Sequence, residues 1–414
     1  MRFFFPDSQD QVDPAFDFVT ESTSPFRVRQ RDDRYAHEVL QRPSYDGLLL
    51  SKAIVDGLPG VSGKYTAAQR HRLYRIGIRR FFRLDKPGWS IMTMGDCGAF
   101  TYARDDEPPY SVDEVIDFYE GCGFDMGISV DHVILGYDPG ETSDQLTEWN
   151  RRQRLTLDLA SAFLQGVLDQ GCRFQPIGVA QGWSPRAFAR AVDELQRMGY
   201  KYIALGGMVP LKTAQILACL EAIAEVRLPD TRLHLLGVTR CDQMTSFAAY
   251  GVESFDSTSP FRQAFKDDHD NYYTADRNFL ALRVPQVEGN PKLKAAIRAG
   301  RIDNDRARLL EQRCLQMLNE YDAGRVDVEA VLESLAAYSV LFEDSRDRRA
   351  DYRDLLENAP WKSCPCGICA SVGIHVVIFR GTERNKRRGF HNLHVFTGKL
   401  QEALGVGPRV ATLV

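Results

Sequence analysis

The feature that most constrains the fold is a regular alternation of short apolar segments with amphipathic stretches over residues 46–260. The helical stretches carry recognisable starts, such as the S-x-x-E capping box at Ser111 and the Ser184-Pro185 pair. Strands that alternate with helices pair in parallel. Seven such units favour an α/β fold of the closed (β/α)8 barrel type, the TIM barrel, over an open sheet. The seven strands are expected within residues 48–50, 89–93, 128–133, 174–180, 202–205, 233–238 and 252–255.

The segments outside this pattern define the expected domain organisation. We interpret residues 1–45 as an N-terminal extension and 46–260 as barrel strands one to seven. Residues 261–360 read as a helical insertion with four helices, because the strand pattern stops there. Residues 361–414 would hold a metal-binding segment, the eighth barrel strand at 374–379 and a last helix at 392–404.

Bulk composition excludes several classes of protein. With 44% hydrophobic and 26% charged residues, the chain resembles an ordinary globular protein. Its net charge of −4 argues against a protein that coats nucleic acid non-specifically. Neither a signal peptide nor an apolar run of membrane-spanning length is evident, and most cysteines are scattered singly. We therefore expect a cytoplasmic location.

A cysteine-rich stretch near the C-terminus predicts a metal site. Cys364, Cys366 and Cys369 form C-x-C-x2-C, and His391 follows on a later segment. Three thiolates and one imidazole match the tetrahedral preference of zinc, and four protein ligands leave no position for a reactive water. The sequence therefore predicts a structural Zn²⁺ site, with His394 or His375 as alternative fourth ligands.

Polar residues stand at the ends of several predicted strands. Asp96, Asp131 and Asp256 occupy such positions, as do Gln181 and the Gly206-Gly207 pair. Because active sites of these barrels lie at the carboxyl ends of the strands, the three carboxylates suit acid–base or glycosyl chemistry. Each aspartate alone has a plainer interpretation as a helix cap or as a partner of a neighbouring side chain. Their joint placement favours a catalytic site.

These residues resemble motifs of the tRNA-guanine transglycosylases, a family of zinc-bearing TIM barrels. The resemblance spans roughly residues 46–400, with the motifs in the family's order. They are Asp96-Cys97-Gly98-Ala99-Phe100 for D-S-G-G-F, Gln181-Gly182-Trp183 for Q-G-G, Gly206-Gly207-Met208 for G-G-L, Phe255-Asp256-Ser257-Thr258-Ser259-Pro260 for F-D-x-x-x-P, and His391-Asn392-Leu393 beside the zinc ligands.

Departures from the family pattern point to one branch of it. Residues 260–360 look unlike the tRNA enzymes, and no RNA-binding domain follows the barrel. The basic segment over residues 379–392 looks like that of the bacterial and phage enzymes that insert 7-deazaguanine bases into DNA. Its cations would contact phosphates, although a solvated loop is the alternative interpretation. They are Arg380, Arg384, Lys386, Arg387 and Arg388.

The resemblance implies a mechanism and a set of partners. Asp256 would be the nucleophile of a covalent glycosyl-enzyme and Asp96 the general acid and base. The base would be bound by Asp131, Gln181, Gly206, Gly207, Cys97 and Met208, with an aromatic ring near Phe100 as a further candidate. We expect exchange of guanine in DNA for a 7-deazaguanine such as preQ0 (7-cyano-7-deazaguanine), after the target base leaves the stack.

Two other functions stay open at this point. The same chemistry on tRNA is one, and an inactive zinc-stapled barrel that only binds nucleic acid is the other. A helper ATPase and a homodimer are further partners compatible with the sequence.

Overall fold

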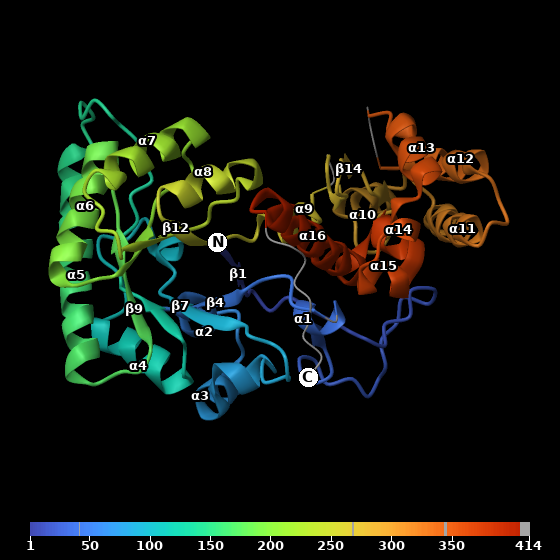
Figure 1. The fold of residues 1–414 in the computed structure, drawn as a ribbon. Helices are drawn as coiled ribbons and strands as arrows, with labels where there is room; N and C mark the ends of the chain where they lie inside the picture. The colour runs from blue at the N-terminus through green and yellow to red at the C-terminus, as the bar shows by residue number, and fades with distance from the viewer. Residues whose placement is uncertain (41, 267–268, 343–345, 406–414) are drawn as a thin grey trace. The chain divides into compact units, whose positions relative to one another are not determined.

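The protein forms two compact units in the computed structural model, which describes residues 1–40, 42–266, 269–342 and 346–405 (Figure 1). The first unit contains Met1–Gln9, Tyr45–Thr258 and, of the described C-terminal residues, 400–405. The second contains Asp10–Ser44 and Ser259–Lys399. The boundary therefore differs from the predicted one, because the N-terminal residues are divided between both units.

The first unit is a closed barrel of eight parallel strands, which confirms the predicted fold class. Each strand hydrogen-bonds to two neighbours, so that the sheet has no free edge. In the order around the barrel the strands are β1 (Arg2–Pro6), β12 (Val252–Asp256), β11 (Arg232–Leu235), β10 (Tyr202–Leu205), β9 (Gln175–Ala180), β8 (Met126–Ile128), β7 (Met92–Asp96) and β4 (Gly47–Ser51).

Helices connect successive strands of this barrel, as expected for parallel pairing. The predicted starts are confirmed, because Ser111 forms a capping box with Glu114 and Ser184 caps a helix whose first residue is Pro185. A small hairpin of β5 (Gly57–Leu58) and β6 (Val61–Ser62) lies between α2 and α3 in the chain. The helices are α2 (Lys52–Asp56), α3 (Ala67–Phe81), α4 (Val112–Cys122), α5 (Leu146–Asp169), α6 (Pro185–Met198), α7 (Thr213–Ala224) and α8 (Met244–Ala249), with 3-10 turns at Ala99–Tyr102 and Cys241–Gln243.

The identity of one barrel strand corrects the sequence-based prediction. Arg2–Pro6 is a barrel strand, so residues 1–45 are not a simple extension. The predicted eighth strand at 374–379 lies outside the barrel: only Ile378–Phe379 (β16) is a strand, and it pairs with Leu282–Arg283 (β15) in the second unit. A strand buried on both faces reads as an unbroken apolar run. The run Phe3-Phe4-Phe5 has that character, but no helix pattern precedes it to reveal its role.

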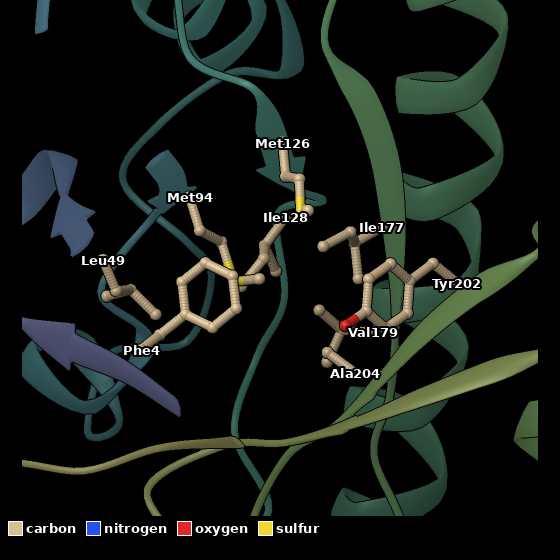
Figure 2. Close-up of a cluster of buried hydrophobic side chains, with 9 residues drawn as sticks. All are labelled: Phe4, Leu49, Met94, Met126, Ile128, Ile177, Val179, Tyr202 and Ala204. Atoms are coloured by element: carbon tan, nitrogen blue, oxygen red, sulfur yellow. The ribbon is translucent and has the colours of Figure 1, made fainter. Parts of the chain in front are cut away.

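The interior of the barrel contains a cluster of side chains from six neighbouring strands, taken from alternate positions along each strand (Figure 2). Side chains point to opposite faces of a strand in turn, so every second residue enters this core. Figure 2 shows the rings and thioethers converging from opposite sides of the barrel. The cluster comprises Phe4, Leu49, Met94, Met126, Ile128, Ile177, Val179, Tyr202 and Ala204. This packed interior leaves the carboxyl ends of the strands as the place for chemistry.

The second unit is mainly helical. Three of the predicted helices match within a few residues: α10 (Pro291–Arg298), α11 (Asn304–Asp322) and α12 (Val328–Ser339). A fourth, α13 (Arg349–Asn358), begins later than predicted. The last helix, α16 (Gly381–Ala403), begins well before the predicted residue 392, because the basic run is its first part and not a loop.

Short elements complete the second unit. They are β2 (Gln11–Val12), β3 (Arg34–Tyr35), α1 (Ala36–Val39), α9 (Ser259–Gln263), β13 (Tyr272–Tyr273), β14 (Asn278–Phe279), α14 (Pro360–Ser363), α15 (Gly367–Val372) and a 3-10 turn at Gly373–Val377. Throughout the described part of the chain, the helices are too short or too polar to cross a membrane.

Candidate active site and metal centre

The predicted catalytic aspartates lie at the carboxyl ends of barrel strands. Asp96 is the last residue of β7 and Asp256 the last of β12. Strand alternation explains why they face inward, since Met94, two residues before Asp96, belongs to the barrel core. Gln181 and Gly206 directly follow β9 and β10. The barrel therefore brings these residues to one mouth, as their positions at strand ends predicted.

A buried network holds Asp131 beside this mouth. The predicted strand through residues 128–133 ends at Ile128, so Asp131 lies on the loop that follows β8. Its Oδ1 accepts a hydrogen bond from the Cys97 thiol (3.3 Å), and its Oδ2 accepts one from Gln181 Nε2 (2.6 Å). The Tyr102 hydroxyl donates to Cys97 Sγ (2.9 Å). Asp131 does not order its neighbour His132, which instead contacts the Asp105 carbonyl, so the plainer interpretation of Asp131 is wrong.

The two glycines after β10 leave room for the Gln181 side chain. A Cβ added to Gly206 would lie 2.1 Å from Gln181 Nε2. Gly207 has a φ of +70°, and a Cβ there would approach the Ile134 carbonyl oxygen to 2.2 Å. Gln181 Oε1 accepts from the Ile134 backbone N–H (3.1 Å), which fixes the amide orientation. Of the other predicted contacts, Met208 is fully buried, whereas the Phe100 side chain is exposed.

Electrostatics favour protonation of Asp96 near neutral pH. Burial raises the pKa of its carboxyl group to about 7, with further contributions from the charges of Asp131 and Asp256. Burial also raises the pKa of Asp131, to about 6, against the hydrogen bonds from Cys97 and Gln181. Like charges near one another in a site of low polarity disfavour simultaneous ionisation. A carboxyl group with a pKa near the working pH can both donate and accept a proton.

Asp256 has neighbours that the sequence analysis missed. Its Oδ1 accepts from the Gly237 backbone N–H (2.9 Å) and lies 3.2 Å from His234 Nε2. His234 is fully buried and lies one strand away, on β11. The signal for this contact was present, since Ser254 and Asp256 share one face of β12 and His234 pairs with Ser254 across the sheet. A strand register is needed to use it, and the sequence alone does not provide one.

The basic run at the start of α16 corrects a prediction. Arg380 and Arg384 are buried and bind Glu21, and Arg380 also binds Glu311. Burial opposes ionisation of Glu21, but the two arginines outweigh it and lower its pKa to about 2. Arg387 binds Glu383 and the Asp13 carbonyl. These guanidinium groups are therefore unavailable to phosphate.

The other two cations of this run are also committed within the second unit. Arg388 is fully buried, and its guanidinium donates to the carbonyls of Val376 (3.2 Å) and Ile378 (3.1 Å). Lys386 donates to the Gln11 carbonyl (3.1 Å). The predicted phosphate contacts are wrong for the four arginines, because buried cations need internal partners, and carboxylates and carbonyls of the second unit provide them.

The four predicted metal ligands converge in the second unit. Their ligand atoms all lie within 4.8 Å of one another. His391 Nδ1 is 3.6 Å from Cys364 Sγ, 3.5 Å from Cys366 Sγ and 3.3 Å from Cys369 Sγ. Tetrahedral zinc with ordinary bond lengths would separate N and S ligands by roughly 3.5 Å. The cluster could therefore hold a zinc ion, and His391 rather than His375 or His394 completes it.

Two neighbouring residues orient the histidine of this cluster. His391 Nε2 lies 2.8 Å from the Tyr273 carbonyl oxygen, which fixes the proton on Nε2 and leaves Nδ1 for the metal. The Tyr272 ring stacks on the imidazole with centroids 4.2 Å apart. Such an arrangement is typical of a closed structural site.

The fold and the two centres together define a class. A closed parallel barrel with carboxyl groups of raised pKa at its mouth is typical of a (β/α)8 enzyme suited to glycosyl transfer. The three-cysteine, one-histidine cluster adds a group that could hold a metal ion. No family model matches the chain. It is, however, 50% identical over 413 residues to a DNA-guanine transglycosylase from Salmonella montevideo, with 98% of each chain covered. The chain thus belongs to the tRNA-guanine transglycosylase superfamily, in its DNA-guanine transglycosylase branch, and is a guanine transglycosylase.

The raised pKa of Asp96 predicts a pH-dependent stability. Between the ordinary value of 3.8 and about 7, the native state retains a proton that the unfolded chain releases. Stability should therefore fall as pH rises through this window. Asp96→Asn removes that dependence, so its Tm should exceed that of wild type at pH 8, and the difference should vanish at pH 3.8 and below. Thermal unfolding across this range tests the expectation, with Asp158→Asn on the exposed face of α5 as control. Parallel profiles for wild type and Asp96→Asn would contradict it.

The metal cluster predicts one zinc ion per chain. Cys369→Ser should lower the bound zinc below one equivalent, and it should destabilise the second unit because the ligands join α15 to α16. Elemental analysis and limited proteolysis measure the two effects. Cys172→Ser is the matched control, because this partly exposed cysteine lies far from the cluster in sequence and outside it in space. Full zinc content in Cys369→Ser would exclude the assigned ligand set.

Proposed function

We propose that this protein exchanges guanine in DNA for a 7-deazaguanine base, which we expect to be preQ0, through a covalent aspartyl-glycosyl intermediate. The observation that carries the proposal is the pairing of two different carboxyl groups at one barrel mouth. Asp256 is held by the Gly237 N–H, and Asp96 has a pKa raised to about 7. Two carboxyl groups whose environments separate their roles are what nucleophilic glycosyl transfer requires.

The first half of the exchange forms the intermediate. The free oxygen of Asp256 attacks C1′ of the target nucleotide, and the bond between C1′ and guanine N9 breaks. Asp96 in its protonated form gives its proton to the departing guanine, which avoids release of an anion. The products of this half are a glycosyl ester on Asp256, neutral guanine and the Asp96 carboxylate.

The second half reverses these roles. The Asp96 carboxylate takes the proton from N9 of the incoming deazaguanine, and that nitrogen attacks C1′ as the ester bond to Asp256 breaks. Asp96 is protonated again and Asp256 is an ionised carboxylate. Two inversions at C1′ restore the β-nucleoside, so that the modified base occupies the same position as guanine.

Base recognition would fall to the network around Asp131. A carboxylate offers about four acceptor positions, and Cys97 and Gln181 occupy only two, so that Asp131 can still accept from a guanine N1–H and 2-amino group. Gln181 keeps one N–H beyond its bond to Asp131, and this N–H and the Gly207 N–H suit the O6 atom. These groups are common to guanine and 7-deazaguanines. Zinc, when bound, would supply structural stabilisation of the second unit.

The partner that we propose is DNA, because the relative that is 50% identical to this chain is a DNA-guanine transglycosylase. Since the basic run of α16 is buried, phosphate contacts must come from another surface. The segment over residues 57–84 carries seven of the chain's lysines and arginines and no aspartate or glutamate, in a chain whose net charge is −4. It belongs to the barrel unit, and its Arg75 and Arg80 are exposed. We assign this β5–α3 segment to the phosphate backbone.

The β5–α3 segment follows β4 in the chain and is tied to α2, the helix directly after that strand. The Tyr74 hydroxyl on α3 donates to Asp56 Oδ2 on α2 (2.9 Å). The strand before α2 ends at Ser51, which pairs with Asp96 in the sheet. DNA bound on α3 would therefore lie on the part of the barrel that follows β4. This strand is the neighbour of β7, which ends in the proposed general acid Asp96. We also propose a cytoplasmic location, because the cysteines are free thiols and the proposed substrate is DNA.

The exchange reaction predicts the behaviour of Asp256→Asn. Purified protein is given duplex DNA, single-stranded DNA or tRNA with preQ0, and nucleosides are analysed by mass spectrometry. Wild type should produce a deazaguanosine in DNA and a protein–DNA adduct that survives denaturation, whereas Asp256→Asn should produce neither. Asp158→Asn is the surface control.

Each other outcome of that experiment has a definite meaning. Product in tRNA alone would overturn DNA as the partner. Activity on single-stranded but not duplex DNA would assign opening of the duplex to a separate helper protein. Full exchange by Asp256→Asn would overturn the nucleophile, and DNA binding by wild type without any exchange under these conditions would overturn the proposed reaction.

The β5–α3 assignment predicts a change in salt dependence. Each lost phosphate contact should reduce the slope of log K against log salt by about 0.9. Arg75→Gln with Arg80→Gln should therefore weaken binding to duplex DNA of any sequence and reduce the slope by about 1 to 2, as measured by fluorescence anisotropy at several salt concentrations. The matched control is Lys294→Gln with Arg298→Gln, a pair of exposed cations on α10. An unchanged slope in the first variant, or an equal change in the control, would overturn the assignment.

A further inference from the structure

Four polar side chains form a continuous buried chain inside the barrel. The Tyr202 hydroxyl lies 2.5 Å from Ser254 Oγ, which lies 2.5 Å from His234 Nδ1. His234 Nε2 is in turn 3.2 Å from Asp256 Oδ1. Tyr202, His234 and Ser254 are fully buried. The chain therefore runs from the apolar cluster of the barrel interior to the proposed nucleophile (Figure 2 shows Tyr202 in that cluster).

Strand geometry explains how these residues meet. Ser254 and Asp256 are two residues apart on β12, so they face the same side, which is the barrel interior. His234 pairs with Ser254 across the sheet from β11, and Tyr202 comes from β10, the next strand. The Phe4 and His234 rings form a T-shaped pair, with centroids 6.0 Å apart. Packing of this kind restricts rotation of the histidine ring.

Counting donors and acceptors shows that all hydrogen bonds in this series of four side chains point toward Asp256 when the imidazole is neutral. An ionised Asp256 only accepts, so a neutral His234 must carry its proton on Nε2 to donate to Oδ1. In the neutral ring Nδ1 is then an acceptor, and Ser254 donates to it. Ser254 Oγ accepts in turn from the Tyr202 hydroxyl. Every hydrogen in the chain is used, and the opposite tautomer would place a nitrogen lone pair against the carboxylate.

We propose that His234 is a positioning residue for the nucleophile, with Ser254 and Tyr202 holding it in the Nε2–H tautomer. The inference rests on the proposed function. His234 and the Gly237 N–H both donate to Oδ1 of Asp256, which turns Oδ2 toward C1′ as the attacking oxygen. A nucleophile held in one orientation avoids much of the entropic part of the barrier.

The same two donors act in the second half of the reaction. When the bond between C1′ and Oδ2 breaks, Asp256 becomes a carboxylate again, and its negative charge is shared between Oδ1 and Oδ2. Two N–H groups already aimed at Oδ1 stabilise that charge without rearrangement. His234 neither gains nor loses a proton in either step, so the proton balance of the exchange is unchanged.

A packing role alone would make different demands on this position. Leucine fills a similar volume in a barrel interior that is otherwise largely apolar, and it would satisfy packing without a buried polar chain. Glutamine, in contrast, can place an N–H donor close to the position of the imidazole Nε2. His234→Leu and His234→Gln are therefore a matched pair that separates donation from filling.

The experiment measures single-turnover formation of the protein–DNA adduct and steady-state base exchange with preQ0. His234→Leu should lower kcat by 100-fold or more, with the KM for DNA within about twofold of wild type, since a misplaced reacting group costs on that order. The kcat of His234→Gln should be at least tenfold higher than that of His234→Leu. Ser254→Ala, which retains the histidine but frees its tautomer, should fall between wild type and His234→Leu, and Tyr202→Phe should have a smaller effect.

Several results would overturn the inference. Folded His234→Leu with wild-type kcat would do so, as would a His234→Gln no more active than His234→Leu, or a change confined to KM. If His234→Leu does not fold, as judged by Tm, then wild-type kcat in Ser254→Ala overturns it instead. The proposed function fails separately, through exchange by Asp256→Asn, whereas failure of this inference leaves Asp256→Asn inactive and His234→Leu active.

Discussion

The interaction on which the barrel unit depends is the insertion of Arg2–Pro6 between the two ends of the sheet. This strand pairs in parallel with β12 on one side and with β4 on the other, so it closes the barrel. Phe4 stands opposite Asp256 in one register and opposite Gly47 in the other, and its ring enters the core. A Cβ on Gly47 would overlap the Phe4 ring at 2.2 Å, so the glycine makes this closure possible. The strand that ends in the proposed nucleophile is thus fixed by the first residues of the chain.

Closure also explains why the site has a polar interior below it. In a closed barrel the inward positions of β10, β11 and β12 must share one core, and there Tyr202, His234 and Ser254 are neighbours. An isolated imidazole would be costly in such a place, because each buried polar atom needs a partner. The chain of hydroxyl, hydroxyl and imidazole ends on Asp256, which satisfies each member. The polar chain and the carboxylate therefore support each other, and neither is explained by packing alone.

The sequence predicted most of the fold, for reasons that particular residues make clear. Strand ends such as Asp96 and Asp256, and helix starts such as Ser184-Pro185, depend on local spacing and turn chemistry, and both can be read directly. The first barrel strand was missed because three phenylalanines in a row have no period that separates a buried strand from other apolar segments. His234 was missed because its role depends on the register between β11 and β12. The cluster that could hold a metal ion was predicted because the spacing of Cys364, Cys366 and Cys369 is itself the signal.

The basic run of α16 shows where charge counting fails. Arg380, Arg384, Arg387 and Arg388 look like a phosphate-binding surface in the sequence, but each guanidinium is buried and has acceptors within the second unit. Two of the carboxylates that neutralise them, Glu21 and Glu311, lie far away in the chain, so a local count of charge cannot include them. The β5–α3 segment differs in the property that matters, because its Arg75 and Arg80 remain exposed to solvent. An arginine is available to a phosphate only when folding leaves its donors unused, so exposure and pairing decide which cations meet DNA. By the same reasoning the arginines of this run attach the helix that carries His391 to the rest of the second unit.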